Sequence, residues 1–221
     1  MSNDPEGNIQ ILKRERGRSV WIDRVANGKT ETVKSWTITP WFAFKLLIGI
    51  AQPLRHCRGA GRIAIASLKT PPVRSLRIGR IGWCPVVKLR MPFIPGLTAL
   101  DFLQTDSRDI RRLASELGCH AAKLAESGFR HRDFKLSNVV IQEKTHDVWL
   151  IDPVGVVRDR DPARSLACML ERLNVEIEHG LAGDVDDIGF LRRCALRGAL
   201  RSMAPNPRRA VIRLLRRHPQ P

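Results

Sequence analysis

The segment that most constrains the fold of this chain spans residues 131–152, where two short apolar runs follow a polar loop. The runs cover residues 139–141 and 148–151, and a polar turn separates them. Short apolar runs bounded by polar turns are typical of paired β-strands. We therefore predict a hairpin that brings together Asn138, which precedes its first strand, and Asp152, which follows its second.

The polar loop before this hairpin carries the residue types that phosphoryl transfer requires. A His-Arg-Asp sequence ends at Asp133, and Asn138 follows at the spacing of the kinase catalytic-loop signature. In that signature the aspartate accepts the proton of the acceptor hydroxyl and the asparagine binds a metal ion. We predict these roles for Asp133 and Asn138. Asp152 is the predicted second magnesium ligand, and Lys135 is a predicted catalytic cation beside the transferring phosphate.

A structural role for the same loop is the alternative. Asp133 would then cap a backbone amide, and Asn138 would satisfy the polar groups of a turn. The loop spacing, combined with the strand, turn and strand that follow, favours the catalytic interpretation. For His131 we expect the structural role, that of a packed histidine that braces the loop.

A second hairpin is predicted near the N-terminus, over residues 17–34, with Asn27-Gly28 as its turn. Lys34 ends its second arm, where kinases place the strand lysine that binds the α- and β-phosphates of ATP. Lys34 is therefore the predicted cofactor-binding residue, and an ordinary surface lysine is the alternative. The sequence has no G-x-G-x-x-G loop. Gly17, after a basic run, is the glycine best placed to cover phosphates.

The remaining pattern predicts two lobes. Helical periodicity covers residues 40–68 with a break near Pro53, and short β-rich runs follow before a proline-rich linker. Beyond this linker the chain is mainly helical. We predict an α+β, protein-kinase-like two-lobed fold, with an N-terminal nucleotide-binding lobe (residues 1–95) that has a small antiparallel sheet. The C-terminal catalytic lobe (residues 96–221) is expected to be short and mainly helical.

Charge and cysteine content restrict the partners and the compartment. Lys and Arg total 38 against 22 Asp and Glu, which favours anionic partners. The five cysteines include no C-x-x-C pair and indicate no disulfide framework. The apolar stretch 36–54 is interrupted by Lys45 and bracketed by Pro40 and Pro53, which leaves about twelve residues where a membrane-spanning helix needs about twenty. It is either a packed helix or an interfacial one. Residues 1–7 lack the order of a secretion signal. We expect a cytoplasmic protein.

Several stretches resemble the bacterial lipopolysaccharide core kinases, which phosphorylate heptose or Kdo sugars. The approach to the loop, Leu-Ala-Glu-Ser-Gly-Phe-Arg-His-Arg-Asp at residues 124–133, is similar to that family, and so is Trp-Leu-Ile-Asp at residues 149–152. Thr-Pro-Pro at residues 70–72 and an arginine-rich C-terminal part without an Ala-Pro-Glu motif are also similar. The resemblance covers roughly residues 18–200 and is most specific over residues 124–155.

The resemblance implies an ATP- and Mg²⁺-dependent kinase at the cytoplasmic face of the inner membrane, in peripheral contact with it. Its implied acceptor is a sugar hydroxyl of an anionic glycolipid. One departure concerns the helix after Lys34, which should carry an acid to pair with that lysine. Residues 54–68 contain none and include His56 instead. Either another acid such as Glu31 substitutes, or nucleotide binding is weakened and the chain is a pseudokinase.

Two further functions compete with a sugar or lipid kinase. An atypical Ser/Thr protein kinase would use the same Asp133, but the missing Ala-Pro-Glu motif leaves little platform for a peptide. A basic nucleic-acid-binding protein would use the C-terminal arginines between residues 192 and 217. Because the aromatic residues are not interleaved with these arginines, nucleic acid is the less favoured partner.

Overall fold

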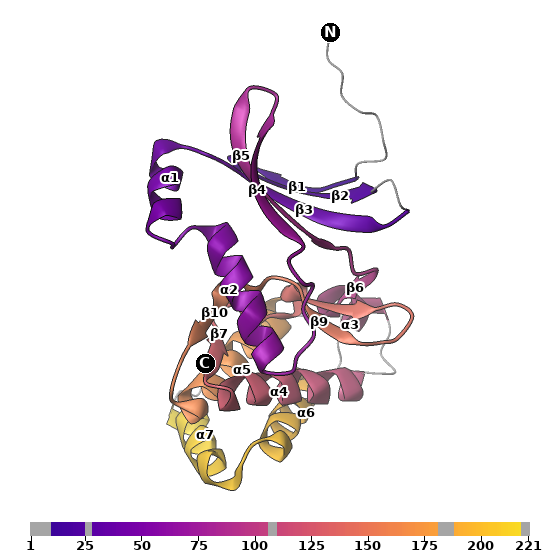
Figure 1. Ribbon diagram of the computed structural model, residues 1–221. Coiled ribbons are helices and arrows are strands. Elements are labelled where there is room, and N and C mark those ends of the chain that lie inside the picture. Colours follow the sequence, from indigo (N-terminus) through magenta and orange to yellow (C-terminus); the bar gives the residue numbers. More distant parts are fainter. Residues whose placement is uncertain (1–9, 25–27, 106–109, 181–187, 218–221) are drawn as a thin grey trace.

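The computed structural model describes residues 10–24, 28–105, 110–180 and 188–217 (Figure 1). It has a mixed α+β structure that contains a small antiparallel sheet, as predicted. The predicted turn residue Asn27 lies outside the described residues. Within the described ranges, no helix combines the length and the apolar character needed to cross a membrane.

Five antiparallel strands form the main sheet, in the order β1-β2-β3-β5-β4. They are β1 (Gln10–Glu15), β2 (Arg18–Arg24), β3 (Thr30–Thr37), β4 (Ser75–Ile81) and β5 (Cys84–Pro92). The predicted N-terminal hairpin corresponds to β2 and β3, in which Val20 lies opposite Lys34. The sequence analysis missed β1, which is exposed along its whole length and therefore lacks an apolar alternation.

Two helices connect β3 to β4, namely α1 (Pro40–Leu47) and α2 (Gln52–Ile65). The break predicted near Pro53 is present at residues 48–51, and Pro53 itself falls in the first turn of α2. Proline is tolerated in that turn because its missing N–H would have no partner within the helix. Figure 1 shows α2 running from the sheet down to the helical part of the molecule.

The rest of the chain is mainly helical. Its elements are β6 (Gly96–Thr98), α3 (Ala99–Thr105), α4 (Ile110–Glu126), β7 (Phe129–His131), η1 (Leu136–Asn138), β8 (Val139–Gln142), β9 (Val148–Leu150), η2 (Pro153–Gly155), β10 (Val156–Arg158), α5 (Pro162–Gly180), α6 (Ile188–Ser202) and α7 (Pro205–Arg217). β8 pairs with β6 and β9, and β7 pairs with β10. The large core cluster lies here, and Ile63 and Leu68 extend it into the segment that contains α2.

Candidate functional site

The predicted hairpin is present and brings its two ends together. β8 pairs with β9, and Val139 lies opposite Leu150. One residue further out, the backbone N–H of Ile151 donates to the carbonyl oxygen of Asn138 at 3.0 Å. Asn138 and Asp152 therefore lie at the same end of this hairpin, where Asn138 is the last residue of η1 and Asp152 directly precedes η2.

Asn138 is held by Asp133 in the loop that precedes the hairpin. Its side-chain Nδ2 donates to the backbone oxygen of Asp133 at 2.9 Å and lies 3.2 Å from Oδ2 of the same residue. With the amide nitrogen engaged in this way, the carbonyl oxygen of the side chain is the atom that could bind a cation. Amide and carboxylate oxygens are the hard ligands that Mg²⁺ prefers. Asn138 and Asp152 fit a magnesium ion in this respect.

The Asp133 carboxylate stands at the surface between two cations. Its side chain is 43% exposed, Oδ2 lies 3.6 Å from Nζ of Lys135, and Oδ1 lies 3.4 Å from the guanidinium of Arg172 on α5. The predicted catalytic pair, Asp133 and Lys135, is thus in contact. Arg172 is a neighbour that the sequence analysis missed. An exposed carboxylate so placed is accessible to a hydroxyl group from solvent.

His131 braces the loop, as expected. Its Nδ1 accepts a hydrogen bond from the backbone N–H of Asp133 at 3.1 Å, and its Nε2 lies 3.0 Å from the backbone oxygen of Asp152. Because Nδ1 must accept, Nε2 carries the proton and donates to Asp152. Burial lowers the pKa of His131, which agrees with a neutral ring. One side chain therefore ties the Asp133 loop to the Asp152 loop.

Glu176 on α5 holds the same loop from the opposite side. Its carboxylate accepts from the hydroxyl of Ser137 at 2.7 Å and from the backbone N–H groups of Leu136 and Ser137. The sequence analysis missed this residue. A signal was present, because Glu176 follows Leu173 by three residues and precedes Ile177 on a helix whose apolar side is buried. An acid on such a stripe indicates a buried hydrogen-bonding role.

Lys34 of β3 meets Asp152 directly, with Nζ 3.4 Å from Oδ1. The sequence separates these residues by more than a hundred positions, and only the fold joins them. Burial opposes ionisation of Asp152, but the neighbouring groups, with Lys34 first among them, together outweigh burial, and the pKa of this carboxyl lies below its ordinary value. Burial lowers the pKa of the Lys34 amine, while Asp152 acts in the opposite direction. Lys34 is thus buried, which excludes the alternative of a surface lysine.

His56 of α2 occupies the place where an acid was expected. It is fully buried, and its Nδ1 lies 3.8 Å from Oδ1 of Asp152. Burial, together with the nearby charge of Lys34, lowers the pKa of His56 to about 3, so the ring is neutral at physiological pH. The helix therefore contributes no charge to the Lys34–Asp152 pair through this side chain.

Glu31 does not substitute for the missing acid, which corrects one of the two alternatives drawn from the sequence. Its carboxylate pairs with Arg74 at 2.6 Å and with Arg90 at 3.3 Å. The reason lies in the geometry of a strand, where successive side chains point to opposite faces. Glu31 and Lys34 are three residues apart on β3 and hence lie on opposite faces of the sheet.

α2 packs closely against the segment that follows Asp152. Gly59 allows this approach, because a Cβ atom there would lie 1.9 Å from the backbone oxygen of Pro153. On the same side of the helix, Arg55 donates to the backbone oxygen of Val154 at 3.1 Å, and Arg62 donates to that of Val156 at 2.5 Å. α2 thus fixes the position of Asp152 through its neighbours in sequence.

Two cavities lie in the neighbourhood of the Lys34–Asp152 pair, and of these two only the first includes a residue of the pair in its wall. The first, of about 370 Å³, is mainly apolar and includes Lys34 and Ile151 in its wall. Its other lining residues come from β1, β2, β3, β5, β6, β8 and the connections around them: Gln10, Leu12, Val20, Ile22, Thr32, Pro71, Met91, Pro92, Phe93, Ile94, Gly96, Thr98 and Val140. Its size and apolar walls suit a flat heterocycle.

The second cavity, of about 620 Å³, is basic. It lies between the β1–β2 turn and the helices α1 and α2. Its lining residues are Glu15, Arg16, Gly17, Arg18, Trp36, Phe42, Lys45, Ile50, Gln52 and Arg55. Arg18 is close enough to Asp152 to lower the pKa of that carboxyl, in addition to the effect of Lys34. Four cations against one acid suit a phosphate or another anionic group.

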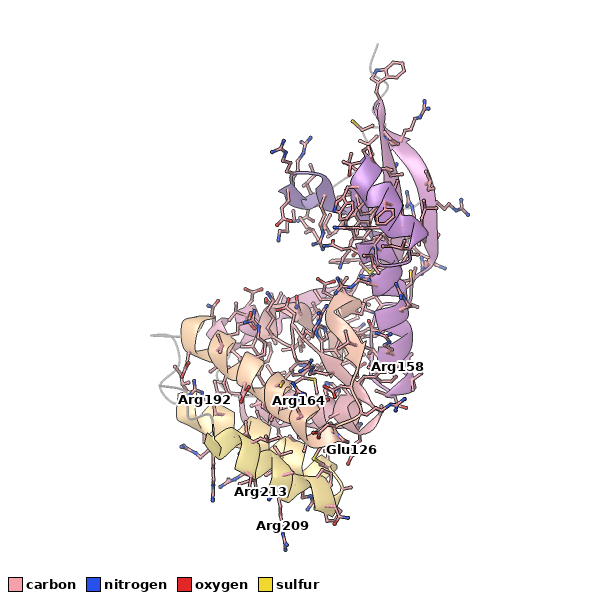
Figure 2. The ribbon with its side chains drawn as sticks, turned by 90° about the vertical axis from the view of Figure 1, so that its left-hand side faces the viewer. Glu126, Arg158, Arg164, Arg192, Arg209 and Arg213 are labelled. Carbon is pink, nitrogen blue, oxygen red and sulfur yellow. The ribbon has the colours of Figure 1, made fainter. Side chains whose placement is uncertain are left out.

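The C-terminal arginines lie apart from this site. Figure 2 shows Arg209 and Arg213 on α7, directed away from the rest of the molecule at the end farthest from the sheet. Arg192 of α6 forms an ion pair with Glu178 of α5. Arg209 and Arg213 give the α7 end of the molecule a basic surface.

The sequence matches no protein-family model and no curated protein. Among the described residues, no group of three or more His, Cys, Asp and Glu side chains could hold a metal ion. The candidate magnesium ligands are instead one carboxylate and one amide. The function is therefore argued from the geometry of the site.

Proposed function

We propose that this chain is an ATP- and Mg²⁺-dependent phosphotransferase with a protein-kinase-like fold, divided into lobes at residues 1–95 and 96–221. The observation that carries the proposal is the contact between Lys34 and Asp152 beside the Asn138–Asp133 pair. Lys34 and Asp152 form one contact, Asn138 and Asp133 form another, and His131 links the loops that carry Asp133 and Asp152. A structural turn explains the Asn138–Asp133 contact but gives no reason to bury Lys34 against Asp152.

In this proposal the nucleotide spans the two cavities. The adenine ring occupies the apolar cavity near Ile151, and the phosphates extend toward Arg18 and Gly17 in the basic one. Lys34 binds the α- and β-phosphates. Magnesium, bound by Asn138 and Asp152, would neutralise charge on the phosphate oxygens. Lys34 then exchanges part of its contact with Asp152 for the phosphates.

Asp133 acts as the base. The acceptor hydroxyl lies against its carboxylate, a bond forms between the hydroxyl oxygen and the γ-phosphorus, and the bond to the ADP oxygen breaks. The hydroxyl proton passes to Asp133. Lys135, 3.6 Å from this carboxylate, stabilises negative charge on the transferring group. The exposure of Asp133 suits an acceptor that arrives from outside the protein.

The acceptor that we propose is a sugar hydroxyl of a lipopolysaccharide-type or other glycolipid, at the cytoplasmic face of the inner membrane. It is supported by the similarity of residues 124–133 and 149–152 to the core kinases and by the positive charge of the chain. Incubation with labelled ATP, Mg²⁺ and a total lipid and glycolipid extract tests both activity and substrate class. Label should enter the glycolipid fraction, and its incorporation should be lost when Asp133 is substituted.

A pseudokinase is the second candidate, and one observation favours it. His56 is neutral where an acid would draw Lys34 away from Asp152, so the two possible phosphate and metal ligands neutralise each other. The same incubation separates the two candidates. A pseudokinase would bind nucleotide weakly or without Mg²⁺ and would transfer no label to any fraction, including protein.

A further inference from the structure

The helix α1 presents an apolar stripe to solvent. Trp41, Phe44, Leu47 and Ile48 follow the spacing of one helical face, and the helix has no buried residue. Trp41 is 63% exposed and Leu47 is 85% exposed. Its opposite side, through Phe42, packs on the small cluster around Trp36. The stripe is therefore the solvent-exposed face of a helix whose other face packs against the protein.

A second exposed apolar group lies next to this helix, at the turn between β4 and β5. Trp83 in that turn is 93% exposed. The backbone N–H of Ile38, just before α1, donates to the oxygen of Pro85 at 2.8 Å, which ties the helix to the base of this turn. Figure 1 shows the β4–β5 hairpin projecting beyond the sheet near α1.

The exposed side of β4 continues toward α1. Leu76 packs against the cluster that contains Phe42, so it faces the side of the sheet that carries α1. Side chains two residues apart share a face of a strand, which places Ile78 and Arg80 on this side as well. Ile78 is exposed. We call the set Trp41, Phe44, Leu47, Ile48, Ile78 and Trp83 the α1 surface.

The chain segment that carries the α1 surface is basic. Residues 32–100 contain no aspartate or glutamate and eleven lysines and arginines. Lys45 lies over the ring of Trp41, 5.0 Å from its centroid, and Arg80 lies on the same side of β4. Exposed tryptophan and phenylalanine bordered by cations are the residue types of helices that lie in a membrane interface.

We propose that the α1 surface docks on a bilayer that contains anionic lipids. Burial of the aromatic and aliphatic side chains in the interface supplies one part of the attraction, and the basic side chains of the same segment supply the other. An acidic protein partner would satisfy the charge but would need a continuous surface, whereas these side chains project from a helix and from the tip of a hairpin.

The inference does not depend on phosphoryl transfer, but it adds to that proposal. Phe42, Lys45 and Ile50 of the same region line the basic cavity. Docking through the α1 surface would therefore hold this cavity at the membrane, within reach of anionic lipid head groups.

Cosedimentation of the full chain with vesicles tests the docking. We expect binding to vesicles that contain phosphatidylglycerol, with a partition coefficient at least ten-fold above that for phosphatidylcholine vesicles and with a decrease at high salt. The combined variant Trp41→Ala, Phe44→Ala and Leu47→Ala should lose at least ten-fold. Arg80→Gln should lose about five-fold, the effect of one cation near an anionic surface. The matched control is Ile65→Ala, an exposed apolar residue on α2 outside this surface, which should bind as the unmodified chain does.

Circular dichroism on the same samples checks that each variant folds, which is expected because the altered side chains are exposed. Equal binding by the unmodified chain and the combined variant would overturn the proposal, as would an absence of binding to anionic vesicles. A concentration-dependent dimer, measured by light scattering without lipid and lost in the combined variant, would assign the surface to a second copy of the chain and would also overturn it. Neither result would affect the transfer of label from ATP, so docking and catalysis fail separately.

Discussion

The two halves of the candidate site are held in different ways. Asp152 is the less exposed acid, with a side chain that is 28% exposed and has Lys34 and His56 beside it. α2 packs closely on the residues that follow Asp152. Asp133 lies at the surface between two cations, and Glu176 accepts hydrogen bonds from the loop that carries it. A cation and polyphosphate need ligands that are fixed before binding, whereas a base must be reached by its substrate. The difference in burial matches this division of roles.

The largest expected effect comes from the exposed half. Asp133→Ala should lower the rate of phosphoryl transfer by about 10³-fold, because general bases contribute in this range. Its unfolding free energy should change little, since the side chain is 43% exposed. Rates with labelled ATP and urea unfolding measure the two quantities. Glu143→Ala, an exposed acid in the hairpin turn, is the control and should retain full activity.

Substitutions around Asp152 should instead change the unfolding free energy. Gly59→Ala forces a Cβ atom against the oxygen of Pro153, so we expect a loss of about 3 kcal/mol of unfolding free energy and weaker nucleotide binding. Gly61→Ala on the same helix meets open space and should stabilise the chain by about 0.5–1 kcal/mol. Equal effects of the two substitutions in urea titrations would show that α2 does not clamp the Asp152 segment.

Glu176→Gln tests the support under the exposed half. The amide keeps the shape but loses the charge that three donors share, and we expect a loss of about 2 kcal/mol in stability. The rate constant for transfer should fall about ten-fold while the KM for ATP stays the same, because the loop and not the nucleotide site is loosened. Glu171→Gln on the same helix is the charge-matched control. A rise in KM without a change in rate would contradict the assignment.

The smallest effect concerns pH. The pKa of His56 is about 3 in the folded chain, below that of an ordinary histidine, so the unfolded chain binds the extra proton on acidification. The unfolding free energy should therefore fall as the pH decreases below the pKa of an ordinary histidine. The His56 contribution should be about 1 kcal/mol between about pH 7.5 and about pH 5.5. His56→Gln should remove it, and the two pH profiles of urea unfolding should differ in slope. Parallel profiles would mean that His56 titrates normally.

The local parts of this site could be predicted from the sequence, and the long-range parts could not. The hairpin and the neighbouring positions of Asn138 and Asp152 follow from apolar runs a few residues apart. The strands β7 and β10 are three residues each and pair across more than twenty positions, so no periodicity marks them. The failure of Glu31 as a partner of Lys34 has another origin, because side chains three residues apart on one strand lie on opposite faces of the sheet.

The contact between α2 and the Asp152 segment could not be predicted from the helical pattern of the sequence. Gly59 and Gly61 both weaken the helical signal, yet only Gly59 faces a neighbouring backbone. The missing acid in α2 was visible in the sequence, whereas the burial and neutrality of His56 depend on packing around Lys34 and Asp152. The sequence therefore predicts that α2 lacks an acid, and the structure shows a buried, neutral histidine beside Asp152.

Calorimetric titration of the chain with ATP, with and without Mg²⁺, tests most directly whether Lys34, Asn138 and Asp152 form one nucleotide site. We predict binding that strengthens when Mg²⁺ is present and loses this metal dependence in Asp152→Asn, while Asp133→Ala still binds. Binding that is indifferent to Mg²⁺ in the unmodified chain, or that is unchanged by Asp152→Asn, would contradict the account.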